Sequence, residues 1–354
     1  MDIQIQERTI GLAHPTYFIA DIAANHDGDF DRAVELIRLA KQAGADAAKF
    51  QNFRARHIVS DYGFKSLGGQ LSHQAAWTKS VYEVYQAAEV PFDWTAKLKE
   101  ACDEVGIHYF SSPYDYEAID MLDPYVPAYK AGSGLTSWPE AIVRMAQFGK
   151  PVLIAAGASE MADVERVMEA VLPVNQQVVL MQCNTNYTAD EANYDHLHLN
   201  VLKTFAARWP DVILGLSDHT QSAAPVVGAV AMGARVIERH FTDSNEREGP
   251  DHKFALNPEN WAHMVEEVRI LERALGSAEK RVADNEKETR MLQRRCLRAA
   301  RDIKAGETFT EDMLEVLRPA VQGALMAWDL PNVVGKQAKT DMPFGKEIRP
   351  DDLA

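Results

Sequence analysis

The sequence of 354 residues contains three cysteines, which are widely spaced and form no Cys-x-x-Cys pair: Cys102, Cys183 and Cys296. This scarcity argues against a disulfide framework and favours a reducing compartment, so we expect a cytoplasmic protein. No run approaches the ~20 apolar residues of a membrane span, and the N-terminus lacks the basic start and apolar stretch of a secretion signal. Basic residues are also few, with 37 Lys and Arg against 52 Asp and Glu and a net charge of -15. That balance disfavours nucleic acid or an anionic membrane as partner.

Short apolar runs alternate with amphipathic segments through most of the chain. The pattern predicts strands at residues 17–24, 45–50, 107–111, 126–131, 152–156, 178–182, 212–216 and 235–239. Helices are expected between them, and glycines such as Gly44 and Gly106 mark helix ends. Eight strands with intervening helices predict an α/β protein with a (β/α)8 TIM barrel. Residues 54–91 are too long for a simple connection, so we expect a small hairpin or lid there.

The chain is longer than the ~250 residues of a typical barrel, which predicts an additional small domain. We place the barrel at residues 1–280, a highly charged linker at 281–293 and a β-rich module at 294–354. The module begins with a strand at Cys296 and includes a short helical stretch at residues 310–314. At about 60 residues it is small for independent stability, so we expect contacts with another part of the protein to stabilise it.

Two histidines, His219 and His240, lie where neighbouring strand-like runs end. If these runs are consecutive barrel strands, both imidazoles reach the same rim and form half of a transition-metal site, with positions left for substrate oxygens. A packed or surface position is the alternative for each. His26 remains open as a third ligand, a substrate contact or a structural residue.

Lysines also stand at strand ends, and two of them at one barrel mouth are costly unless they meet anions. Lys49 and Lys130, with the hydroxyls of Ser112, Ser133 and Ser217, would make a cradle for phosphate or carboxylate. The alternative is that each lysine pairs with a carboxylate at the rim. The remaining polar candidates at strand ends are Asp21, Gln51, Asn184, Tyr187 and Asp251. We expect the Glu238-Arg239 pair to lie on the barrel wall with no catalytic role.

Taken together, these motifs resemble the sialic acid (N-acetylneuraminate) synthase family. The resemblance runs through nearly the whole chain and rests on Asp21-Ile-Ala-Ala-Asn25-His26-Asp27-Gly28, Lys49-Phe50-Gln51, Ser111-Ser112-Pro113-Tyr114, Tyr-Lys-Ala-Gly-Ser-Gly at 129–134, Gly-Leu-Ser-Asp-His-Thr at 215–220, Glu-Arg-His-Phe-Thr at 238–242 and Gly-Pro-Asp-His at 249–252. The tail resembles the antifreeze-protein-like (SAF) domain of the same family, including Arg318-Pro319.

The resemblance implies a metal-dependent condensation of phosphoenolpyruvate with an N-acyl-mannosamine-type or related amino sugar. The products are a 2-keto-3-deoxy nonulosonic (sialic-type) acid and phosphate, released by C–O cleavage. It implies a divalent metal on His219 and His240, manganese first, with magnesium or cobalt as alternatives. Catalytic roles fall on Asp21, Lys49, Gln51 and Asp251, and substrate-binding roles on Ser112, Lys130, Ser133, Asn184, Tyr187, Ser217 and Arg318. It also implies a domain-swapped homodimer in which Arg318 contacts the sugar of the partner's barrel.

The sequence departs from the family pattern on the sugar side. Asp21 and Leu135 stand where the family has glutamates, and Ala155-Ala156-Gly157 replaces Ser-Thr-Gly. Residues 182–188 read Gln-Cys-Asn-Thr-Asn-Tyr-Thr where many members have His-Cys-x-x-x-Tyr-Pro. These changes predict the same reaction on a related amino sugar. Two alternatives remain: a sugar- and phosphoenolpyruvate-binding homologue with impaired catalysis, and a metal-dependent TIM-barrel hydrolase.

Overall fold

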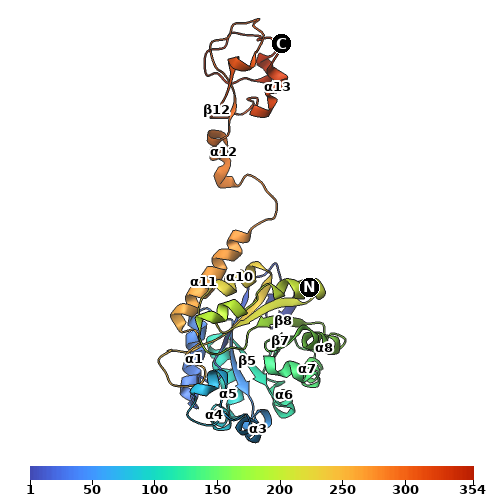
Figure 1. The fold of residues 1–354 in the computed structure, drawn as a ribbon, viewed down its shortest axis with the longest axis vertical. Coiled ribbons are helices and arrows are strands. Elements are labelled where there is room, and N and C mark those ends of the chain that lie inside the picture. The colour runs from blue at the N-terminus through green and yellow to red at the C-terminus, as the bar shows by residue number, and fades with distance from the viewer. The chain divides into compact units, whose positions relative to one another are not determined.

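The computed structural model describes residues 1–354, apart from the side chain of Ala76. The chain forms two compact units, Met1–Gly276 and Ser277–Ala354 (Figure 1). None of the described helices combines the length and apolar character that crossing a bilayer requires.

The first unit is built around an eight-stranded sheet whose order is β5-β4-β3-β10-β9-β8-β7-β6. Every ladder in it is parallel. The end strands β5 and β6 also lie side by side, which makes the sheet a nearly closed barrel. The strands are β3 Tyr17–Asp21, β4 Ala47–Asn52, β5 His108–Pro113, β6 Tyr129–Ala131, β7 Val152–Ala155, β8 Val178–Cys183, β9 Ile213–Asp218 and β10 Ala234–His240. The predicted TIM barrel is confirmed.

Each barrel strand is followed by a helix on the outside of the barrel (Figure 1). In α1, Asp29 accepts a hydrogen bond from the Arg32 N–H at the helix start, and buried residues recur every three or four positions. Helix α5 ends at Gly106, whose φ of 68° suits glycine. The helices are α1 Phe30–Gln42, α5 Trp94–Val105, α6 Tyr116–Leu122, α7 Pro139–Ala146, α8 Met161–Val171, α9 Val201–Arg208, α10 Ala224–Ala231 and α11 Pro258–Leu275.

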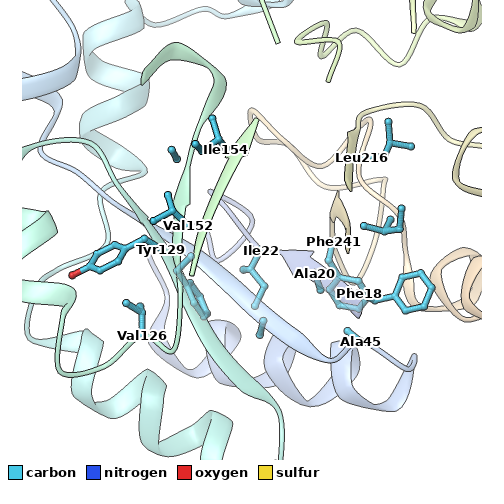
Figure 2. Packing of buried hydrophobic residues seen from close by; sticks show 14 of the residues in the cluster. Phe18, Ala20, Ile22, Ala45, Val126, Tyr129, Val152, Ile154, Leu216 and Phe241 are labelled. Atoms are coloured by element: carbon cyan, nitrogen blue, oxygen red, sulfur yellow. The ribbon is translucent and has the colours of Figure 1, made fainter. Parts of the chain in front are cut away.

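The two-residue period of the strands divides the core into two layers. In β3, Phe18 and Ala20 face outward and belong to the cluster between strands and helices (Figure 2). Tyr17 and Ile19 face the barrel interior. A hairpin of β1 (Ile3–Ile5) and β2 (Arg8–Ile10) contributes three isoleucines to the interior cluster. The same alternation decides which residues at the other end of each strand face the barrel mouth.

Residues 54–91, where a small hairpin or lid was expected, form short helices and no hairpin. They are α2 Ala55–Ile58, α3 Asp61–Ser66, η1 Ser72–Ala76 and α4 Val81–Ala87. Helix α4 begins with a capping box between Ser80 and Glu83. Phe64 and His73 of this insertion line the cavity described below, so the insertion forms part of the barrel mouth.

The second unit contains a small antiparallel sheet of β11 (Cys296–Ala299) and β12 (Leu314–Leu317). Its core gathers apolar residues from the whole module, among them Leu297, Phe309 and Ile348. Short helices complete it: η4 Asp284–Glu286, α12 Lys287–Gln293, η5 Glu311–Met313, η6 Ala327–Asp329, α13 Leu330–Val333 and η7 Pro350–Asp352. Two of these, η4 and α12, lie within residues 281–293, the predicted linker. The domain boundaries given in the sequence analysis stay predictions.

Candidate active site

The carboxyl ends of the barrel strands surround a cavity of about 730 Å³. Side chains alternate between the two faces of a strand, so the residues at the strand ends that line this cavity face the same way as the residues of the interior core. The predicted site residues that line it are Asp21, Lys49, Gln51, Ser112, Lys130, Ser133, Tyr187, Ser217, His219 and His240. The structure thus brings ten of the predicted site residues together around one cavity.

Lys49 is at the centre of a buried polar cluster. Its Nζ lies 2.6 Å from Asp21 Oδ2 and donates to Ser112 Oγ at 3.2 Å. Gln51 Nε2 donates to the same Asp21 oxygen at 3.2 Å. Only 2% of Lys49 is exposed, so its ammonium group is satisfied by these contacts rather than by water.

Lys130 meets a carboxylate that the sequence analysis had placed outside the site. Its Nζ lies 3.3 Å from Glu238 Oε1, and the other Glu238 oxygen is 3.7 Å from Lys49 Nζ. Ser217 Oγ donates to Glu238 Oε1 at 3.1 Å. Both lysines therefore pair with carboxylates at the barrel mouth, as the alternative interpretation had it, and these carboxylates line the same cavity.

Neighbouring charges favour the ionised forms of Lys49 and Glu238, whereas burial raises the pKa of Asp21. Burial alone lowers the pKa of Lys49, but the carboxylates of Asp21 and Glu238 outweigh burial and raise it. Burial opposes ionisation of Glu238 as well, yet Lys130 and Lys49 bring its pKa down to about 2. An anionic substrate would thus meet two fixed ammonium groups whose present partners are carboxylates.

Ser133 completes the polar wall near Lys130. Its Oγ accepts a hydrogen bond from the Gly157 N–H at 3.1 Å. A Cβ at position 157 would lie 2.7 Å from this oxygen and 2.9 Å from Cys183 Sγ. Glycine is required here because the backbone approaches both side chains closely.

The two predicted metal ligands face the same cavity from β9 and β10. The ring centroids of His219 and His240 are 5.3 Å apart. His219 Nδ1 hydrogen-bonds to the Asn184 carbonyl oxygen at 2.8 Å, so its Nε2 carries the free lone pair. His240 Nδ1 is buried without a hydrogen-bond partner. Burial lowers the pKa of His219 to about 4 and also lowers that of His240, which keeps both rings neutral.

These residues fit a metal as a pair of ligands. Neutral imidazoles with an unshared nitrogen are common ligands of divalent transition metals, and the backbone bond of His219 fixes its tautomer. Among the described residues, no group of three or more His, Cys, Asp or Glu side chains is arranged to hold a metal ion. The protein therefore offers two ligands, and the other positions would fall to water or substrate.

The chain matches the NeuB family over residues 36–280 and the SAF domain over residues 294–354. The chain belongs to the NeuB family. The resemblance inferred from the motifs is thereby confirmed, and so is the SAF domain of the tail.

Several relatives of this NeuB-family chain are named as synthases of N-acetylneuraminate 9-phosphate, legionaminic acid or pseudaminic acid. It is 33% identical over 331 residues to N-acetylneuraminate-9-phosphate synthase of Homo sapiens, covering 93% of this chain and 90% of the relative. It is 32% identical over 343 residues to pseudaminic acid synthase of Campylobacter jejuni, covering 95% and 96%. The crystal structure of spore coat polysaccharide biosynthesis protein SpsE of Bacillus subtilis matches with a TM-score of 0.66 and 29% identity, covering 100% of this chain and 99% of the other.

A second, smaller cavity of about 150 Å³ adjoins the main one in this NeuB-family barrel. Asp251 lines it, and Asp251 Oδ2 lies 3.8 Å from His240 Nδ1. Tyr187 lines both cavities and packs its ring against His219 with centroids 4.4 Å apart. Leu135 lines the main cavity and is 5% exposed, so an apolar side chain stands where the family pattern has glutamate.

Two candidate residues of the barrel unit, Asn184 and His26, do not join this cluster. Asn184 follows the inward-facing Cys183, so it points outward, donates to the His196 carbonyl oxygen and lines a neighbouring cavity. Its predicted place in the substrate cavity is wrong for the side chain, although its carbonyl orients His219. His26 is buried, accepts from the Gly28 N–H and packs near Trp94, which favours the structural alternative. Arg318 is exposed in the second unit, directly after β12.

Sequence reasoning missed several residues that line the cavity, and two of them, Glu238 and Cys183, lie on barrel strands. Glu238 contacts both lysines, so its assignment to the barrel wall without a role in the site is wrong. Cys183 also lines the cavity, and burial raises the pKa of its thiol to about 11. Parity was the available signal, because Glu238 lies two residues before His240 on one strand and so shares its face.

Proposed function

We propose that this chain condenses phosphoenolpyruvate with the open-chain form of an N-acyl-mannosamine-type or related amino sugar. The products are a 2-keto-3-deoxy nonulosonic acid and inorganic phosphate. The observation that supports this most is the convergence of Lys49, Lys130, His219 and His240 on one cavity. The named functions of the relatives agree with it.

The chain's own residues divide between the two substrates. Lys49 and Lys130, with the hydroxyls around them, would hold the phosphate and carboxylate of phosphoenolpyruvate. A divalent metal, manganese first, would be held by His219 and His240 and would supply Lewis-acid polarisation of the sugar aldehyde. Asp21, fixed by Lys49, would contact sugar hydroxyls or move protons.

In the proposed reaction, C3 of phosphoenolpyruvate forms a bond to the aldehyde carbon, and the aldehyde oxygen becomes a hydroxyl by taking one proton of the water that adds to C2. The C2–O bond of the phosphate ester then breaks, so phosphate leaves with the bridging oxygen and the second proton of that water. The oxygen of the water stays on C2 as the carbonyl oxygen of the 2-keto product. The buried cavity holds both substrates in register, which supplies much of the rate. Gln51 and Asp251 lie beside Asp21 and His240, where the sugar would be bound.

Incubation with phosphoenolpyruvate, manganese and a panel of hexosamines, free and 6-phosphorylated, tests this proposal. We expect phosphate release that depends on both the sugar and the metal. Turnover of a sugar derivative without phosphoenolpyruvate would instead indicate a hydrolase. Saturable binding of both substrates without turnover would indicate a catalytically impaired homologue.

We expect Leu135 to set part of the sugar preference. Leu135→Glu would place a carboxylate on an apolar part of the cavity wall, and buried polar groups reject substrates that leave them unpaired. The ratio of kcat/KM between N-acetylmannosamine and the preferred sugar should change by about tenfold or more in favour of N-acetylmannosamine. Leu135→Met, which keeps an apolar side chain of similar volume, is the control. Equal ratios in all three proteins would remove Leu135 from the specificity argument.

We further propose a homodimer in which Arg318 of one subunit completes the sugar site of the other barrel. Arg318→Ala and His240→Ala should each be inactive alone. Mixed after dissociation and reassociation, they should regain about a quarter of wild-type activity, because half of the dimers are mixed and carry one intact site. Light scattering measures the dimer and phosphate release measures activity. Failure to recover activity in confirmed mixed dimers would contradict the arrangement in trans.

A further inference from the structure

His73, in the insertion between β4 and α5, lines three adjoining cavities. It lines the main cavity of about 730 Å³ and the smaller one of about 150 Å³. It also lines an open groove of about 1040 Å³ that extends over residues 245–250 and Lys253. Tyr187 lines the same three. The two rings therefore form the wall that these spaces share.

The His73 ring is held by aromatic neighbours. Its centroid lies 5.5 Å from that of Trp77 and 5.0 Å from that of Tyr187, both in edge-to-face geometry. Tyr187 in turn packs against His219 and Phe254, with centroids 4.4 Å and 5.2 Å away. A contact chain thus runs from the insertion to the imidazole pair.

One ring nitrogen of His73 has no hydrogen-bond partner among the residues that the structure describes. Nδ1 is buried and makes no hydrogen bond. Buried polar atoms are nearly always paired, and an unpaired one is costly unless a ligand or a small closure supplies the missing bond. The neighbouring small cavity is mostly aromatic and aliphatic with few polar groups, the lining that small-molecule sites have. His73 is one of those few.

We propose that His73 is a further substrate-binding residue, which hydrogen-bonds the amino sugar and fixes Tyr187 against His219. This rests on the proposed function, because it assumes that the sugar occupies the aromatic side of the cavity. Lys49 and Lys130 line the main cavity but not the small one, so phosphoenolpyruvate is assigned to a different part of the site. The inference therefore predicts an effect on the sugar alone.

Two substitutions separate the hydrogen-bonding role of the His73 ring nitrogen from the packing of the ring. His73→Phe keeps a ring against Trp77 and Tyr187 but removes both nitrogens, and it should raise KM for the sugar by about tenfold or more. KM for phosphoenolpyruvate should stay within about twofold. His73→Asn keeps a polar atom near Nδ1 and should bring KM for the sugar to within about threefold of wild type. The matched control is His263→Phe, at an exposed position on α11.

Calorimetric titration with N-acetylmannosamine and the rest of the hexosamine panel, at saturating manganese, makes the test independent of turnover. Weaker sugar binding by His73→Phe supports the inference even if the wild type releases no phosphate, in which case the proposed function alone fails. Unchanged sugar KM and Kd in His73→Phe overturn the inference and leave the function standing. Equal losses for sugar and phosphoenolpyruvate, with a lower Tm, would show a merely structural role. A wild type that binds no sugar of the panel overturns both.

Discussion

Replacement of either cavity imidazole, as His219→Ala or His240→Ala, is expected to lower metal-dependent phosphate release by about a thousandfold or more. The two rings face one another from adjacent strands, and each is neutral at pH 7 with a nitrogen free of strong partners. Loss of either leaves a single protein ligand, which does not hold a divalent ion at micromolar concentrations. The lost polarisation of the aldehyde should appear in kcat and in metal affinity together.

The fold should survive these changes. His240 Nδ1 makes no hydrogen bond, and His219 contributes one to the Asn184 carbonyl oxygen, a loss of about 1 kcal/mol. Circular dichroism and thermal unfolding check this, and manganese titration followed by electron paramagnetic resonance measures binding. His196→Ala, at an exposed position in the neighbouring cavity, serves as control. Wild-type, metal-dependent turnover in both variants would remove the metal assignment.

Lys130→Met should abolish useful binding of phosphoenolpyruvate, raising its KM by about a hundredfold or more because a buried charge-assisted contact is lost. The same substitution should cost about 3 kcal/mol of folding stability, since Glu238 then remains buried with one fewer cation. A single variant cannot separate these effects. The double variant Lys130→Met/Glu238→Gln does, because it removes both charges of the pair.

The double variant should recover folding stability without recovering the binding of phosphoenolpyruvate. Urea unfolding should show that most of the lost stability returns, because no unpaired charge stays in the cavity. Binding of phosphoenolpyruvate, measured by calorimetry, should remain weak. Lys203→Met on α9, away from the cavity, is the control for loss of a lysine. Recovery of phosphoenolpyruvate binding in the double variant would reduce Lys130 to a structural partner of Glu238.

The barrel was predictable because its signal is repeated along the chain. Apolar strands and the helices after them recur eight times, and glycines mark some of the helix ends, so an error at one boundary does not alter the fold class. The rim residues followed from the same regularity, since His219 and His240 end consecutive parallel strands. The order of the strands alone therefore predicted which residues lie at the barrel mouth, without any knowledge of side-chain contacts.

It was harder to predict which face of a strand each side chain occupies, and the errors at Asn184 and Glu238 arise from this. Asn184 and Glu238 were placed by strand order rather than by parity, and a shift of one residue reverses the face. Counting by two from Tyr17 and Ile19 shows that Asp21 faces inward, and the same count from Val236 gives Glu238 and His240. Applied in advance, that count would have found the carboxylate between the lysines.

The insertion at residues 54–91 shows a different limit. Its length indicated a folded segment, but short helices of four to seven residues carry too weak a periodicity to be recognised. The place of His73 beside Tyr187 depends on tertiary packing between this insertion and the loop after β8. No local pattern in the sequence records that contact.

Phosphoenolpyruvate on the lysine side and a divalent cation on the histidine side should occupy one cavity at the same time. Relaxation of the phosphoenolpyruvate ³¹P nucleus in the presence of protein and Mn²⁺ tests it directly, because paramagnetic enhancement falls steeply with distance. We expect strong enhancement in the wild type. His219→Ala should lose the enhancement by losing the ion, and Lys130→Met/Glu238→Gln should lose it by losing the ligand. Tight binding of both Mn²⁺ and phosphoenolpyruvate without any enhancement would place them apart and contradict the account.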